Sequence, residues 1–73
     1  MADDLINLQR KLGKNIKKIR EAKGLSLWDV SHACTIDASK IAKIEKGEFN
    51  ITLRTINEIS KGLDTTPSKL FDF

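Results

Sequence analysis

The side chains whose types and spacing suggest chemistry are mainly basic. Seven of the thirteen basic residues fall within positions 10–23, and they are Arg10, Lys11, Lys14, Lys17, Lys18, Arg20 and Lys23. A second group, Lys40, Lys43 and Lys46, surrounds Glu45. Basic groups clustered in this way favour binding to phosphate, as on a nucleic-acid backbone. A solvated helix face is the alternative interpretation.

No set of side chains suits catalysis or metal binding. The sequence contains one cysteine, Cys34, and one histidine, His32. It lacks a Ser/His/Asp set, paired carboxylates and a glycine-rich phosphate loop. One cysteine cannot form an internal disulfide. We therefore expect a protein that is not an enzyme and needs no metal or cofactor, and nothing indicates a small-molecule effector.

Length and composition narrow the class further. The 73 residues carry a net charge of +3, with 40% hydrophobic and 32% charged residues, which suits one small globular domain. No apolar run reaches the ~18–20 residues that span a bilayer, and the start lacks the features of a signal peptide. We expect a cytoplasmic protein without membrane contact.

The apolar spacing is helical throughout. One stripe comprises Leu5, Leu8, Leu12, Ile16 and Ile19. Its intervals of three and four residues predict a long amphipathic helix that ends at Gly24. A second helix is expected from Ser26, with Asp29 completing a capping box, to Thr35. Its inward-facing residues would be Val30, Ala33 and Cys34.

Three further helices follow. We expect one from Asp37, as its N-cap, to Gly47, one capped by Thr52, and a short one after Thr66 with Pro67 in its first turn. The inward-facing residues are Ile41 and Ile44 in the third helix and Leu53, Ile56, Ile59 and Leu63 in the fourth. A loop, residues 48–51, separates these two helices. No segment alternates with the period of a strand, so the prediction is an all-α fold of five helices.

Residues 26–46 predict two short helices joined by a break of about three residues. Helices joined by so tight a turn cross steeply, and the second can enter a DNA major groove. Helical hairpins also occur in proteins that bind no DNA, so the spacing alone does not decide the function.

The motifs resemble a known family. Residues 12–26, LGKNIKKIREAKGLS, resemble the opening of the phage repressor and Cro-like (XRE-type) helix-turn-helix domains. The similarity continues through IAKIEKG and NITL at 41–47 and 50–53, and TPSKLF at 66–71 matches the family's close. The resemblance implies a five-helix lambda-repressor-like domain over 1–73 with an extended first helix. It places the helix-turn-helix at about 26–46 and a dimerisation region at about 52–73.

The resemblance also implies roles for single residues. Ala38, Ser39 and Lys43 match positions of the recognition helix, 38–46, that face base edges. Positions matched to DNA backbone contacts are Leu27, Lys40, Lys46 and Asn50. Arg20 and Glu45 match a partly buried ion pair that ties the first helix to the recognition helix.

Several positions depart from the family pattern. Leu27 replaces a glutamine that reaches phosphate, so one polar contact is missing. Thr35 replaces the turn glycine, and because threonine disfavours positive φ, the turn must be different or strained. Ala38 is shorter than the usual polar side chain. The recognition helix therefore offers few base contacts, and DNA shape or flanking loops must add to the readout.

Three other side chains on the second helix need an interpretation. We expect Trp28 to pack on the first helix or on Leu27, with a contact from its indole N–H to DNA backbone as the alternative. Cys34 is expected to be an inert buried thiol. His32 lies on the outer face and receives no role.

The resulting prediction is a sequence-specific transcriptional regulator, bacterial or phage and associated with the nucleoid. It binds double-stranded DNA as a homodimer on a pseudo-palindromic operator, with recognition helices about 34 Å apart. The predicted dimer residues are Leu70, Phe71 and Phe73. Residues 1–11 are expected to lengthen the first helix and to cover Trp28 or join the dimer contact.

Other interpretations remain open. Family members of this size include Cro-like repressors, restriction–modification controller proteins and antitoxins, and the controller proteins are closest in size. A protein-interaction module that binds a partner through Trp28, Leu27 and the terminal phenylalanines is the alternative from another class. The chain could also be one domain of a larger regulator, although Met1 and the ending at Phe73 argue against it.

Overall fold

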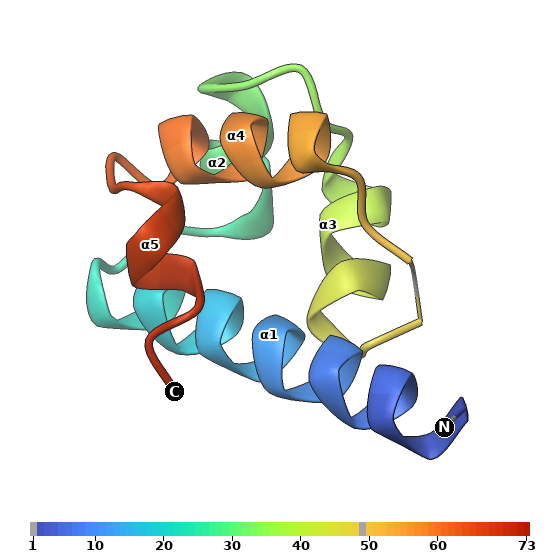
Figure 1. Cartoon of the computed structure of the whole chain (residues 1–73). Coiled ribbons are helices and arrows are strands. Elements are labelled where there is room, and N and C mark those ends of the chain that lie inside the picture. The colour runs from blue at the N-terminus through green and yellow to red at the C-terminus, as the bar shows by residue number, and fades with distance from the viewer. Residues whose placement is uncertain (1, 49) are drawn as a thin grey trace.

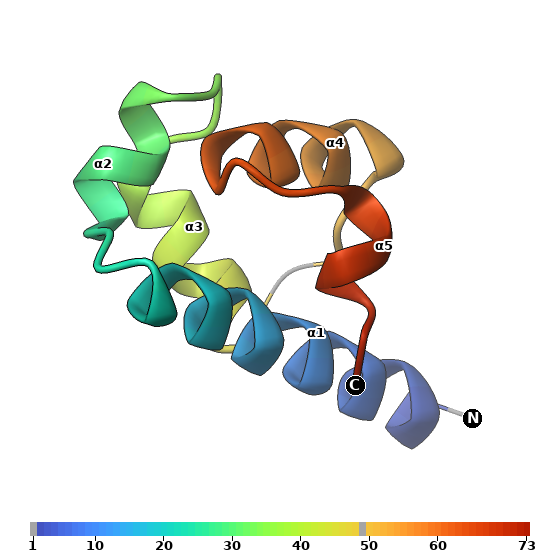
Figure 2. The ribbon, with the colours of Figure 1, turned by 90° about the vertical axis from the view of Figure 1, so that its left-hand side faces the viewer.

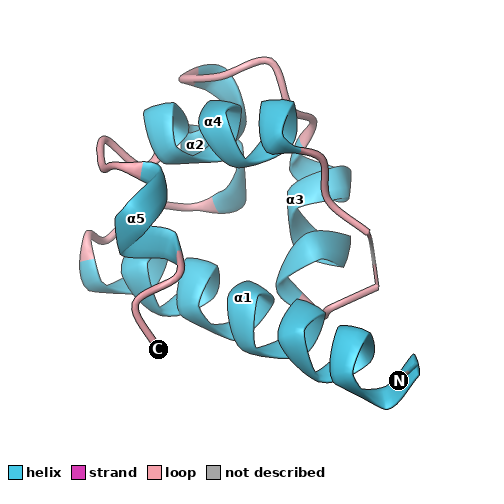
Figure 3. Cartoon of the chain, viewed as in Figure 1, coloured by secondary structure: helices cyan, strands magenta, loops and turns pink. Residues whose placement is uncertain are grey.

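The computed structural model describes residues 2–48 and 50–73, and every regular element in this part of the chain is a helix (Figures 1 and 3). The helices are α1 (Ala2–Ala22), α2 (Leu27–His32), α3 (Ala38–Glu45), α4 (Leu53–Gly62) and α5 (Pro67–Leu70). The predicted all-α class is therefore confirmed. Phe49, in the predicted loop, lies outside the described residues. None of the described helices combines the length and apolar character needed to cross a membrane.

Three helices end with a residue in the left-handed conformation. Gly24 (φ 69°) follows α1, Gly47 (φ 77°) follows α3 and Asp64 (φ 54°) follows α4. In each case the next backbone N–H donates to a carbonyl of the last turn, for example Thr65 to Ser60 at 2.9 Å. The two glycine ends are as the sequence predicts. Aspartate is one of the few other residues that tolerates this conformation.

The helix starts differ in how they are capped. The hydroxyl of Ser26 accepts from the N–H of Asp29 at 3.0 Å, and the carboxylate of Asp29 accepts from the N–H of Ser26 at 2.9 Å, which confirms the predicted capping box. Thr52 accepts from the N–H of Thr55. Asp37 occupies the N-cap position of α3, but its side chain accepts no capping hydrogen bond, so the predicted cap is wrong in that respect.

The core draws on all five helices. It consists of Leu12, Ile16, Val30, Ile41, Ile44, Ile56, Ile59, Leu63 and Leu70. α1 runs beneath the other helices, α3 and α5 stand at its two sides, and α4 closes the far end (Figures 1 and 2). The fold thereby holds α3 against both α1 and α2 and leaves its other face outside.

Four residues predicted to face inward are exposed instead. Leu5 and Leu8 are about half exposed, because the first turns of α1 extend past the helices that cover the rest of it (Figure 1). Leu53 is 85% exposed at the first position of α4, where the buried stripe begins only at Ile56. Ala33, the C-cap of α2, is also exposed.

Candidate nucleic-acid interface

The outer face of α3 is the candidate DNA-reading surface. Ile41 and Ile44 are buried, which turns the opposite face of the helix outward. Ser39 and Lys43 lie on that outward face, one turn apart, and both are exposed. The hydroxyl of Ser39 lies 3.5 Å from a carboxylate oxygen of Asp37, a weak contact that a base edge could replace. Ala38 is half-buried at the start of the helix.

The residues predicted to contact the DNA backbone divide into two groups. Lys46 is exposed at the end of α3, and Lys40 is half-buried on the same helix. Asn50 is exposed and lines an apolar groove beside α1. Leu27 is half-buried and its side chain packs against the core, so the side chain offers no group to phosphate, and a DNA backbone contact by this residue stays a prediction.

Arg20 and Glu45 form a two-point ion pair between α1 and α3. Nε of Arg20 donates to Oε2 of Glu45 at 2.8 Å, and Nη2 donates to Oε1 at 3.0 Å. Nη1 donates to the carbonyl oxygen of Leu25 at 2.9 Å. The side chains are 12% and 6% exposed. The hydrogen bond to Glu45 raises the pKa of Arg20 above its already high ordinary value, so the charge is permanent.

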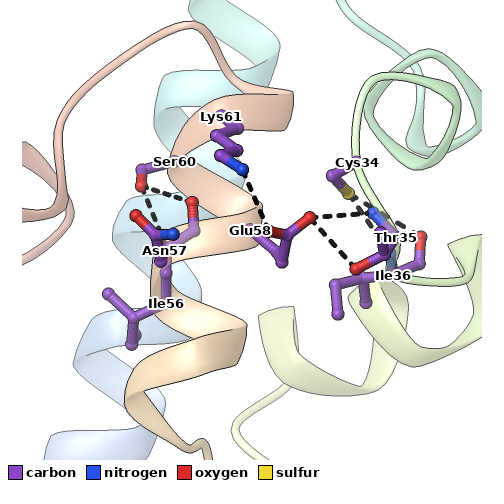
Figure 4. A network of polar contacts seen from close by, with 8 residues as sticks. All are labelled: Cys34, Thr35, Ile36, Ile56, Asn57, Glu58, Ser60 and Lys61. Atoms are coloured by element: carbon purple, nitrogen blue, oxygen red, sulfur yellow. Dashed lines mark hydrogen bonds and ion pairs between the residues drawn. The ribbon is translucent and has the colours of Figure 1, made fainter.

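The turn between α2 and α3 is held from α4 (Figure 4). Thr35 donates from its backbone N–H at 3.2 Å and from its hydroxyl at 3.0 Å to Oε1 of Glu58. Lys61 donates to the other carboxylate oxygen at 3.3 Å. Within the described residues, positive φ occurs at Gly24, Gly47 and Asp64 and not at Thr35. The turn therefore differs from one made by a glycine with positive φ. The carboxylate of Glu58 accepts a hydrogen bond from the exposed N–H of Thr35.

We expect this carboxylate to make the stability of the turn depend on pH. The hydroxyl of Thr35, and then its backbone N–H, lower the pKa of Glu58. A lowered pKa in the folded state means stability that is present at neutral pH. This stability is lost as the pH falls below the unfolded value of about 4.3 and through the folded value. We expect Glu58→Gln to weaken this acid-side loss of stability, measured by urea unfolding between pH 3 and 7.

Thr35→Val is the matched control, because it removes the hydroxyl donor and leaves both the carboxylate and the backbone N–H in place. It should lower stability at neutral pH and reduce the acid dependence only in part. An unchanged pH dependence in Glu58→Gln would show that the carboxylate does not act on folding.

Trp28 does not pack inside the protein. Its side chain is 63% exposed, and its ring contacts that of His32 at an interplanar angle of 42°, with the centroids 3.7 Å apart. The expected packing on α1 or Leu27 is wrong, because position 28 points away from the buried face that Val30 defines. Cys34 is half-buried against the core, and its sulfur accepts from the N–H of Ile36 at 3.4 Å. No cluster of three potential metal ligands occurs among the described residues.

The three predicted dimer residues differ in burial and in the surface that they line. Leu70 has 0% exposure and belongs to the core, so its assignment to the dimer interface is corrected, because a fully enclosed side chain cannot meet a partner. Phe71 is 44% exposed and lines the apolar groove, whereas Phe73 lines a separate cavity beside α1. The two rings are 6.4 Å apart.

The helix-turn-helix family model matches residues 16–70, and the described structure carries the two crossing helices of that motif, α2 and α3. The chain belongs to this family, a class of DNA-binding transcriptional regulators and not of enzymes. The resemblance expected from the sequence is thereby confirmed.

Its relatives include restriction–modification controller proteins. The control protein C.BamHI of Bacillus amyloliquefaciens is 32% identical over 68 residues, covering 92% of this chain and 84% of the relative. The crystal structure of the controller protein C.AhdI from Aeromonas hydrophila has a TM-score of 0.82 and 32% identity, covering 94% of this chain and 98% of that one. A helix-turn-helix transcriptional regulator from Vibrio cholerae has a TM-score of 0.87 at 25% identity, with 92% of this chain matching 38% of its length.

Proposed function

We propose that this protein is a controller-type transcriptional regulator that binds a pseudo-palindromic operator as a homodimer. Residues 38–46 form the recognition helix in the major groove, within a helix-turn-helix at about 26–46. Residues at about 52–73 contribute to the dimer. Lysines at the rim of this helix neutralise phosphates and supply most of the affinity.

The observation that carries this proposal is the way in which α3 is held against the rest of the protein. Its inner face is buried through Ile41 and Ile44, and the ion pair from Arg20 holds its last turn. The opposite face offers a hydroxyl at Ser39 and an ammonium group at Lys43, which can bond to base edges in the major groove. With only two polar side chains at these positions, DNA shape must supply part of the specificity.

Substitutions of Lys43 and Lys46, near the end of α3, should distinguish contacts to bases from contacts to the DNA backbone. We expect Lys43→Ala to relax preference at one base pair per half-site, a loss of about 1–3 kcal/mol for the preferred sequence. Lys46→Ala should weaken all sequences alike and reduce the salt slope by about 1 per subunit. Selection from random duplexes, followed by binding at several salt concentrations, measures both.

Lys69→Ala, which removes an exposed lysine of α5, is the control and should change neither property. Enrichment of a two-fold symmetric motif by the unmodified protein supports the proposal. If no motif is enriched and the salt slope is near zero, the protein is not a DNA reader. Unchanged sequence specificity in Lys43→Ala would show that the base contacts lie elsewhere on α3.

The proposed dimer surface is the apolar groove where α1, α4 and α5 meet. Leu5, Leu8, Leu53 and Phe71 line it, and all four side chains are exposed in the single chain. Leu12 and Ile56 join it to the core. Exposed apolar side chains gathered on a small protein are typical of a surface that another molecule covers. A second copy would cover the leucines in the first turns of α1, which the described helices leave about half exposed.

Removing this apolar surface should produce monomers. We expect Leu53→Ser and Phe71→Ser each to weaken dimerisation at least tenfold in sedimentation equilibrium, because each removes an anchor from the groove. Trp28→Ser is the matched control: it removes another exposed large side chain but should leave the dimer intact. A dimer unaltered by both groove variants would place the interface on another surface.

A protein-interaction role is the second candidate, and the exposed Trp28 favours it. Tryptophan is among the side chains most often found at the centre of protein interfaces. Here its ring contacts that of His32 on the exposed side of α2. The DNA selection described above separates the two candidates, since a module that binds only a partner protein enriches no DNA motif.

A further inference from the structure

A cavity of about 390 Å³ lies between α1 and the carboxyl-terminal segment. Its walls are formed by Lys11, Lys14, Asn15, Lys18, Asp72 and Phe73. The volume falls within the range of about 300–1,000 Å³ that is usual for small-molecule sites. Figure 1 shows α5 and the carboxyl end on the opposite side of the molecule from α3, so a duplex seated on α3 does not cover this cavity.

The side chains that line the cavity carry more positive than negative charge. Lys11, Lys14 and Lys18 are spaced by three and four residues and therefore share one face of α1, about one turn apart. Within the described part of the chain, none of the three has an ion-pair partner. Asp72 is the single carboxylate side chain in the wall. Like charges at this spacing repel one another on an isolated helix, and an anion placed between them removes that repulsion.

The cavity also has an aromatic wall, Phe73, which follows a segment that is hydrogen-bonded to α1. Both hydrogens of the Asn15 side-chain amide are used, at 3.0 Å to the carbonyl of Lys69 and 2.8 Å to that of Leu70. Leu70 is itself buried in the core. These two hydrogen bonds therefore tie residues 69–70, just before Phe73, to α1. The ring of Phe73 is about half exposed, which leaves a surface on which a planar group can stack.

We infer that this cavity binds a nucleoside polyphosphate, with its phosphates on the three lysines and its base on the ring of Phe73. Ammonium groups are point-charge donors to phosphate oxygens, and groups one helical turn apart can serve successive phosphates of one ligand. Aromatic side chains accept any base by stacking. A concave, mainly carbon-lined site of this volume suits a small ligand better than a flat partner surface.

The test is a ¹⁵N–¹H NMR titration of the full chain with ATP, run beside adenosine, tripolyphosphate and a 20-base-pair duplex. We expect ATP to shift the amides of residues 11–18 and 69–73 with saturation. Adenosine and tripolyphosphate should each bind at least tenfold more weakly, because each lacks one half of the ligand. The result does not depend on operator recognition, so it can succeed or fail independently of the proposed function.

Variants distinguish a site from general charge attraction. Lys14→Gln and Lys18→Gln should each weaken ATP binding at least fivefold. Lys17→Gln removes the same charge from an exposed position of α1 outside the cavity, and it should change binding less than twofold. Phe73→Leu should weaken ATP binding and leave tripolyphosphate binding unchanged.

Three results would overturn the inference. They are an absence of shifts with ATP, equal weakening by Lys17→Gln and Lys14→Gln, and shifts at these amides with the duplex but not with ATP. The last result would make this face a contact to DNA backbone.

Discussion

Glu45→Gln is expected to lower the free energy of unfolding by about 3 kcal/mol. Breaking a buried ion pair by removing one charge costs about 3–5 kcal/mol, mainly because the other charge is left without compensation. The lower end applies here, since the side chains of Arg20 and Glu45 retain 12% and 6% exposure. For 73 residues the total stability is about 4–11 kcal/mol, so the loss is a large fraction of it.

Urea unfolding followed by circular dichroism measures this effect. Lys61→Met is the matched control: it breaks the pair with Glu58, in which the lysine side chain is 62% exposed, and it should cost no more than about 1 kcal/mol. The double variant Arg20→Met/Glu45→Leu should be more stable than either single charge deletion, because it strands no charge. If Glu45→Gln costs no more than Lys61→Met, the pair does not contribute to holding α3.

Gly13→Ala is expected to destabilise the protein by about 3 kcal/mol, although alanine is the better helix former. In the interior of an exposed helix the same substitution stabilises by about 1 kcal/mol. Here, a Cβ at position 13 would collide with the carbonyl oxygen of Ile44 and lie 2.7 Å from that of Glu45. These are backbone atoms of α3 and cannot rotate away. Overpacking of this kind costs about 1–3 kcal/mol, and the upper end applies to backbone.

An alanine introduced elsewhere on α1 supplies the control. Lys17→Ala changes an exposed position of the helix and should alter the free energy of unfolding by less than about 0.5 kcal/mol. Because Gly13→Ala pushes α3 away from α1, operator binding should fall even under conditions where the variant remains folded. A Gly13→Ala protein as stable as the unmodified one would mean that the two helices are free to separate.

Most of the fold is readable from local patterns. The capping box of Ser26, the helix ends at Gly24 and Gly47, and the inward positions of Ile41 and Ile44 all follow from neighbours within four residues. These features depend on hydrogen bonds and apolar spacing within one helix, so tertiary contacts are not needed to anticipate them.

The wrong predictions of burial concern apolar stripes, because the spacing of a stripe does not indicate which other helices will cover it. Leu53 continues the apolar spacing of α4 but lies one turn before the region that the other helices cover. Leu70 is predicted at the dimer surface, yet α5 folds back against α1 and α4 and Leu70 is enclosed. Spacing predicts which residues share a face, and the neighbours of that face decide whether it is buried.

Some functional residues carry no local signal. Glu58 supports the turn at Thr35 from 23 positions away, and nothing near it in the sequence marks that role. Gly13 could have been noticed as a glycine inside a strong helical pattern, because such a residue often marks a close backbone approach. The sequence shows Lys11, Lys14 and Lys18 on one face, but the aromatic wall opposite them depends on the return of the chain at α5.

Local sequence patterns are enough to assign the class of this protein, an all-helical member of the helix-turn-helix family in which Ser39 and Lys43 are exposed on α3. They are enough because helix spacing, caps and motif order are local properties. The tertiary structure decided how α3 is held, through Gly13, the Arg20–Glu45 pair and the support of Thr35 by Glu58. It also decided which apolar and basic surfaces remain open. Those outcomes depend on contacts between residues far apart in the chain, which only the folded arrangement of the five helices brings together.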